Sequence, residues 1–214
     1  MKTTSAHPLI YLITDGSLTN QNFAEKSIET LRLIEQAVAA GVPLVQIREK
    51  NLFTRLLFEL ASRAVEISRS SRTKILVNDR PDVASAAGAD GVHLTEQSLP
   101  ANVVRKSFPE LELIGVSTHS LEGTRLAANV GADFAVFGPV FATPGKGEGV
   151  GTTKLKEVCD AVSPFPVIAL GGIDAGNFEN ALDAGAAGFA AIRFLNDLGS
   201  FRLLADRGLL KVKT

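Results

Sequence analysis

Short apolar runs alternate along the chain with longer stretches in which apolar residues recur at helical spacing. The first run, Leu9–Ile13, is followed by a stretch in which Leu31 and Ile34 fall on one helix face. Seven further runs follow the same plan, at residues 44–47, 75–77, 91–94, 113–116, 134–137, 167–170 and 188–192. Strands that are almost continuously apolar are typical of a parallel sheet covered on both faces. The pattern predicts an α/β fold of eight strand-then-helix units, which is a single-domain (β/α)8 TIM barrel.

Four helix-to-strand junctions look alike and recur at intervals of roughly two strand-helix units. They lie at residues 40–42, 87–91, 131–133 and 184–188. Each carries a glycine, which can end a helix in the left-handed backbone conformation that larger residues resist. We therefore interpret the junctions as structural joints at the N-terminal face of the barrel. A doubly wound sheet is the alternative fold, although the chain shows no early Gly-x-Gly-x-x-Gly fingerprint.

The length of 214 residues suits one domain, which we expect at residues 8–214 after a polar N-terminal tail at 1–7. The formal net charge of -1 offers no basic surface for a nucleic-acid partner. The tail lacks an apolar signal core, and no apolar run approaches the roughly 20 residues that span a bilayer. One cysteine, Cys159, excludes an intramolecular disulfide. These features predict a reduced, cytoplasmic setting with no membrane partner, and they leave a homo-oligomer open.

The catalytic groups of such barrels sit at the carboxyl ends of the strands and in the loops just beyond them. The candidates at these positions are Gln46, Arg48, Lys50, Asn78, Asp79, Ser117, His119, Thr143, Lys146, Gly171, Gly172, Ile192 and Arg193.

Gly171-Gly172 follows the seventh apolar run and precedes a predicted helix. Without side chains, the backbone N–H groups of such a pair can approach a phosphate, and the dipole of a helix N-terminus favours the anion. The ends of the seventh and eighth strands are also the usual phosphate site of this fold. We therefore expect a phosphate here, and the structural alternative is a tight turn that merely requires glycine.

Arg48, Lys50 and Lys146 follow predicted strand ends, and we expect them to converge on a second anionic group. The alternative for any single one of them is ordinary surface charge. Asp79 is a candidate ligand of Mg²⁺, which proteins usually bind through one or two carboxylates together with substrate phosphates.

His119 is the one histidine beyond a predicted strand end, where it suits acid or base chemistry near neutral pH. It is equally placed to orient its loop beside a helix cap. His93 falls within the fourth apolar run, where a satisfied histidine of the core or barrel is the favoured interpretation.

These segments resemble the thiamine phosphate synthase and TenI family. The matching stretches are YLITD (residues 11–15), VQIREK (45–50), VNDR (77–80), GADGVHL (88–94), IGVSTHS (114–120), FGPVFATP (137–144) and ALGGI (169–173). They occur in order from about Leu9 to Ile192.

The resemblance implies a barrel enzyme that joins hydroxymethylpyrimidine diphosphate to thiazole phosphate, with Mg²⁺ assisting the loss of pyrophosphate. It implies that the pyrimidine diphosphate is held by Gln46, Arg48, Lys50, Asn78 and Lys146. It implies that the joined groups and the thiazole phosphate are surrounded by Ser117, Thr143, Gly171 and Gly172. Lys146 and His119 are the catalytic candidates that follow, and Asp79 is the metal ligand.

The chain departs from the synthase pattern at three places. Ser98 occupies the position at which the family carries its second Mg²⁺ ligand, an Asp, and the nearby carboxylate of Glu96 is displaced by two residues. Arg193 occupies a position that is usually Ser, and an arginine can bind phosphate in a bidentate way. The segment 146–151 looks shorter than the usual synthase loop.

Two other functions stay open. TenI-like relatives often lack the second metal carboxylate, and one such activity is thiazole tautomerisation, in which His119 would act as acid and base without Mg²⁺. A diverged ligand-binding or regulatory protein without catalysis is the third alternative. The synthase is favoured by residues that a tautomerase does not need, namely Gln46, Lys50, Asn78, Asp79 and Lys146. An aldolase is excluded because the run at 134–137 offers no Schiff-base lysine.

Overall fold

Among the described residues, eight parallel strands close into a ring in chain order, so that the first strand pairs with the last. The computed structural model describes residues 7–143, 145 and 147–211. The strands are β1 (Leu9–Ile13), β2 (Leu44–Ile47), β3 (Lys74–Asn78), β4 (Gly91–Leu94), β5 (Leu113–Thr118), β6 (Phe134–Phe137), β7 (Val167–Leu170) and β8 (Gly188–Ala191). The helices are α1 (Phe23–Ala39), α2 (Thr54–Ser68), α3 (Pro81–Ala87), α4 (Ala101–Ser107), α5 (Leu121–Asn129), α6 (Gly151–Val162), α7 (Phe178–Asp183) and α8 (Gly199–Asp206). The predicted (β/α)8 barrel is confirmed.

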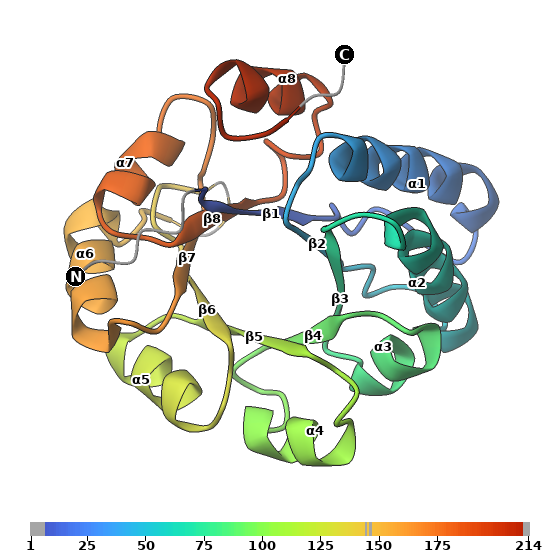
Figure 1. The fold of residues 1–214 in the computed structure, drawn as a ribbon, viewed down its shortest axis with the longest axis horizontal. Helices are drawn as coiled ribbons and strands as arrows, with labels where there is room; N and C mark the ends of the chain where they lie inside the picture. The colour runs from blue at the N-terminus through green and yellow to red at the C-terminus, as the bar shows by residue number, and fades with distance from the viewer. Residues whose placement is uncertain (1–6, 144, 146, 212–214) are drawn as a thin grey trace.

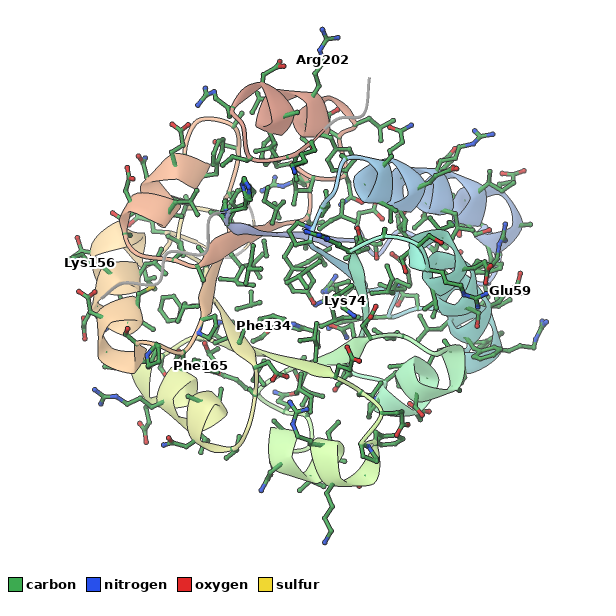
Figure 2. All side chains as sticks on the ribbon, viewed as in Figure 1. Glu59, Lys74, Phe134, Lys156, Phe165 and Arg202 are labelled. Carbon is green, nitrogen blue, oxygen red and sulfur yellow. The ribbon has the colours of Figure 1, made fainter. Side chains whose placement is uncertain are left out.

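Two apolar layers hold the barrel together, because successive side chains of a strand point to opposite faces. Figure 1 shows the strands as an inner ring and the helices as an outer ring around it. The side chains inside the ring form one cluster, namely Tyr11, Ile13, Leu44, Leu76, Phe134, Val136, Ile168 and Ala190. The alternate strand residues pack under the helices in a second, larger cluster. Figure 2 shows Phe134 inside the ring and Glu59, Lys156 and Arg202 on the outward sides of the helices.

The repeated glycine junctions hold the N-terminal rim. Gly88 follows α3 with a φ of 68°, and the Asp90 carboxylate accepts the N–H of Ile75 at 2.8 Å. Gly131, with a φ of 87°, and Asp133 repeat this arrangement, since the Asp133 carboxylate accepts an N–H of β5 at 2.7 Å. The predicted role of these junctions as structural joints is confirmed.

Asn196 fastens the loop after β8 to the first strand. Its Nδ2 donates to the carbonyl of Ile13 at 2.8 Å and to the carbonyl of Ile192 at 2.7 Å. In the same loop, the ring centroid of Phe194 lies 6.5 Å from the ring centroid of Phe189 in β8. The two ends of the sheet are therefore joined by a side chain as well as by the β1–β8 pairing.

Three strands have boundaries that differ from the expectation. β3 runs from Lys74 to Asn78 and extends one residue beyond each end of its apolar run. β5 continues two residues beyond its apolar run, because Ser117 and Thr118 still pair with β6. β8 ends at Ala191, so Ile192 lies just beyond the strand and not within it. None of the described helices is both long and apolar enough to cross a membrane.

Gly115, inside the ring on β5, leaves room for two neighbouring rings. A Cβ atom there would lie 2.4 Å from the ring of Phe134 and 2.8 Å from Nδ1 of His93. Gly115→Ala should therefore lower the free energy of unfolding by about 1–3 kcal/mol, the usual cost of overpacking. Gly199→Ala is the matched control, because the nearest contact of its Cβ is at 3.4 Å. Urea denaturation measures both, and equal losses in the two variants would contradict the prediction.

Candidate active site

Two cavities open where the strands end, and together they contain most of the residues singled out in the sequence. The first measures about 260 Å³ and is lined by Ile47, Glu49, Lys50, Leu52, Leu57, Asn78, Asp79 and Arg80. The second measures about 160 Å³, and its lining includes Ser117, His119, Pro139, Thr143, Gly171, Gly172, Ile192 and Arg193. Lys146 lies outside the described residues. The candidate residues thus divide between a cavity at β2 and β3 and a cavity at β5 to β8.

Asp79 occupies a left-handed backbone conformation, with a φ of 56°, that few residues other than glycine adopt. Its N–H donates to the carbonyl of His93 at 2.8 Å, which fixes the turn after β3 against β4. The Asp79 carboxylate accepts a hydrogen bond from the Ser98 hydroxyl. Sparsely populated backbone conformations persist only where the surroundings enforce them, and they cluster at functional sites. Ser98 therefore lies directly against the one carboxylate predicted to bind a metal.

Glu96 does not take the place of a second carboxylate beside Asp79. Its Oε1 accepts the backbone N–H of His119 at 3.1 Å, so this side chain orders the loop after β5. In the part of the chain that the structure describes, no three His, Cys, Asp or Glu side chains gather as a metal site would require. A cation at Asp79 would draw its remaining oxygen ligands from Ser98, water or a bound phosphate group.

Glu49 has a structural role that the sequence did not reveal. It is 2% exposed, and its carboxylate accepts the N–H groups of Gly16 at 3.2 Å and Leu18 at 2.9 Å. Burial raises the pKa of Glu49 despite these hydrogen bonds. Next to it, the N–H of Arg48 donates to Oγ1 of Thr14 at 2.8 Å. The end of β2 is thereby tied to the loop after β1. Glu49 lies beyond the end of β2, and its role depends on backbone groups of the loop after β1, so no local sequence pattern signalled it.

Arg80 lines the first cavity and was given no role from the sequence. Its guanidinium is held by Asp82 at 2.8 Å and 2.6 Å and by Oγ1 of Thr54 at 3.2 Å. The ion pair with Asp82 raises the pKa of Arg80 and lowers the pKa of Asp82. With Lys50, Arg80 gives this cavity two cationic side chains.

The glycine pair after β7 is required by close packing. A Cβ atom at Gly171 would lie 2.5 Å from Cα of Pro139, and one at Gly172 would lie 2.5 Å from the carbonyl of Ala142. The N–H of Phe141 also donates to the carbonyl of Gly171 at 3.0 Å. The loop after β6 therefore rests on this pair, and both positions require glycine whether or not a phosphate binds there.

The helix expected after the glycine pair is present, but it does not begin at the pair. α7 begins only at Phe178, and the intervening turn is held by Asn177, whose Nδ2 donates to the carbonyl of Gly172 at 2.8 Å. Residues 173–177 form a closed turn because Asp174 and Asn177 satisfy its backbone groups. An anion at the pair would therefore meet turn backbone and the neighbouring Arg193, without a helix terminus.

His119 lies at the edge of the second cavity with one ring nitrogen engaged. Its Nδ1 is hydrogen-bonded to the carbonyl of Gly138. A carbonyl only accepts, so Nδ1 carries a proton and Nε2 of the neutral ring carries a lone pair. The next residue, Ser120, caps α5 by accepting the N–H of Gly123 at 3.0 Å. The structure therefore agrees with both interpretations of His119, as a base and as the neighbour of a helix cap.

A chain of four polar side chains crosses the inside of the barrel. Nε2 of Gln46 donates to the Tyr11 hydroxyl at 2.9 Å, and that hydroxyl lies 3.3 Å from Nδ1 of His93. Nε2 of His93 lies 2.9 Å from Oγ of Ser117. Burial, and to a smaller extent the charge of Arg48, lowers the pKa of His93 to about 3. The expectation of a satisfied histidine within the barrel is confirmed.

The chain is similar to known proteins in both sequence and structure. The family model described as thiamine monophosphate synthase matches residues 10–195. A relative from Geobacter sulfurreducens is 45% identical over 186 residues, which cover 86% of this chain and 84% of the relative's chain. The thiamine-phosphate synthase of Methanosarcina barkeri is 40% identical, over 85% of this chain and 80% of its own. The solved thiamine phosphate pyrophosphorylase of Pyrococcus furiosus superimposes with a TM-score of 0.76 at 29% identity, covering 92% of this chain and 95% of that one.

The low pKa of His93 makes stability depend on pH. In the unfolded chain this imidazole titrates near 6.5, whereas in the folded barrel its pKa is about 3. Only the unfolded state gains this proton as the pH falls below about 6.5, so folding stability is lost in that direction. Between pH 7 and pH 5 the loss from this group is about 2 kcal/mol. Urea denaturation of wild type and His93→Gln at both pH values measures it, and an unchanged pH dependence in the variant would contradict the prediction.

Proposed function

The chain belongs to the thiamine monophosphate synthase family, and we propose that it joins hydroxymethylpyrimidine diphosphate to thiazole phosphate with release of pyrophosphate. The observation that carries the proposal is the pair of cavities at one rim of the barrel. The first combines Lys50 and Arg80 with Asp79, which suits a diphosphate and its cation. The second combines the Gly171-Gly172 turn with Arg193, which suits a monophosphate.

The proposed reaction is a substitution at the carbon that links the pyrimidine to its diphosphate. The carbon–oxygen bond breaks and pyrophosphate leaves with the electron pair, while the thiazole nitrogen forms the new carbon–nitrogen bond. A cationic pyrimidine develops as the anion departs. Lys50 and Arg80 lower the barrier by neutralising the leaving group, and the second cavity holds the thiazole in line with the reacting carbon. Gln46, Asn78, Ser117 and Thr143 belong to the proposal as groups that orient the two substrates.

Mg²⁺ is part of the proposal as a cation shared between protein and substrate. Asp79 supplies one carboxylate and Ser98 one hydroxyl, and Mg²⁺ commonly takes one or two carboxylates together with substrate phosphates and water. These donors fit a cation that arrives with the diphosphate better than a cation held by the protein alone. When bound, the cation supplies positive charge to the leaving pyrophosphate.

A thiazole tautomerase is the second candidate function, and the free Nε2 of His119 at the second cavity favours it. That reaction moves one proton and needs neither Asp79 nor Lys50. A binding or regulatory protein without catalysis is the third candidate. We further propose a cytoplasmic location with small-molecule partners, in agreement with the buried free thiol of Cys159.

A synthase assay separates these functions. Wild-type protein should release pyrophosphate from the pyrimidine diphosphate only when thiazole phosphate and Mg²⁺ are present. Asp79→Asn should lower kcat/KM by about 100-fold or more, because asparagine tolerates the left-handed backbone but lacks the charge for the cation. Asp160→Asn, which changes an exposed carboxylate on α6, is the matched control. Isomerisation of carboxythiazole phosphate without pyrophosphate release would replace the synthase by the tautomerase, and ligand-dependent stabilisation with neither reaction would indicate a binding protein.

Ser98 offers a test of the cation that does not depend on turnover. Ser98→Asp would set two carboxylates side by side, so without metal the melting temperature should fall by about 2–4 °C through charge repulsion. Millimolar Mg²⁺ should reverse this loss, because binding to the folded state stabilises it. Ser98→Asn matches the size of the new side chain without its charge and should respond to Mg²⁺ no more than wild type does. Equal Mg²⁺ responses in the two variants would exclude a cation at Asp79.

A further inference from the structure

The polar chain inside the barrel has a direction that its hydrogen bonds determine. Gln46 donates its amide N–H to the oxygen of Tyr11, so the Tyr11 proton is available to the next acceptor along the chain, Nδ1 of His93. A neutral imidazole carries one proton, which must then reside on Nε2. Nε2–H lies 2.9 Å from Oγ of Ser117 and donates to it.

His93 is suited to accept from Tyr11 and donate to Ser117 because its ring stays uncharged. It is 3% exposed, and its ring lies among Tyr11 and Phe134, whose centroids are 5.8 Å and 6.2 Å from its own. Arg48, at the end of β2, adds a positive charge that opposes protonation of the ring. A charged ring would donate from both nitrogens and abolish the direction of the chain.

The packing of β5 makes room for this ring. A Cβ atom at Gly115 would come within 2.8 Å of Nδ1 of His93. Gly115 contributes no apolar side chain at this point, where a barrel interior ordinarily packs branched residues. The imidazole therefore occupies its position at the expense of apolar packing.

We propose that Tyr11 and His93 are positioning residues that make Ser117 a hydrogen-bond donor toward the second cavity. Ser117 lines that cavity, and its oxygen accepts from His93, so its own proton is presented to whatever is bound. The atom selected there is a hydrogen-bond acceptor, either a ring nitrogen of the pyrimidine or an oxygen of the thiazole phosphate. The identity of this acceptor atom rests on the proposed function, whereas the direction of the hydrogen bonds does not.

The direction of the chain can be measured without any substrate. The chain has three histidines, so ¹⁵N NMR of the imidazole rings gives three pairs of nitrogen signals, and the pair missing in His93→Gln belongs to His93. We expect a protonated Nε2 and an unprotonated Nδ1 for His93 at pH 7. A protonated Nδ1 would mean that the chain runs in the reverse direction, and it would overturn the proposal.

Kinetics identify the substrate that Ser117 contacts. Ser117→Ala, Tyr11→Phe and His93→Leu should raise KM by about 10- to 100-fold for one and the same substrate, since each removes a directed hydrogen bond. His93→Gln should stay within about fivefold of wild type, because its amide can accept from Tyr11 and donate to Ser117. A rise for the pyrimidine diphosphate identifies the ring nitrogen as the acceptor, and a rise for the thiazole phosphate identifies the phosphate.

Two results would overturn the positioning role. One is an unchanged KM for both substrates in folded Tyr11→Phe and His93→Leu, and the other is an equal loss in His93→Gln and His93→Leu. Thermal denaturation of every variant shows which of them fold, and Tyr11→Phe is the mildest change if His93→Leu does not. Absence of synthase turnover in wild type would refute the proposed function alone, because the NMR measurement stands independently of it.

Discussion

Pairing between β1 and β8 closes the sheet, and this closure determines where chemistry is possible on the molecule. In a closed ring of parallel strands (Figure 1), all carboxyl ends meet at one rim. Lys50, Asp79 and Arg193 therefore reach a common face although they come from distant parts of the chain. Closure also removes the two exposed edges that an open sheet would leave. Asn196 reinforces the seam with two side-chain hydrogen bonds.

The inside of the ring combines apolar packing with a fully connected polar chain. An unpaired polar group in such a place costs about 1–3 kcal/mol, which explains why Gln46, Tyr11 and His93 bond to one another. Phe134 packs edge-on against Tyr11, with ring centroids 5.7 Å apart at 84°. The polar side chains therefore connect β1, β2, β4 and β5, and the chain ends at Ser117, which lines the second cavity.

Sequence reasoning was most successful where a periodic pattern had one structural solution. The apolar runs predicted all eight strands, and the ends of β2, β4, β6 and β7 fell where expected, because a strand buried on both faces is apolar for its whole length. The site was predicted less well. Lys50 lies beyond the end of β2 at Ile47, so its position depends on a loop. The helix expected after Gly172 begins only at Phe178, after a turn. The buried role of Glu49 depends on a loop more than 30 residues away, which no local pattern describes.

The joints at Gly88–Asp90 and Gly131–Asp133 give the N-terminal rim of the barrel a repeated construction. At both joints a glycine is followed two residues later by an aspartate, whose carboxylate accepts an N–H of the preceding strand. One joint lies before β4 and the other before β6, at the rim opposite the two cavities. Substitutions in the loops that line the cavities therefore leave these anchoring hydrogen bonds intact.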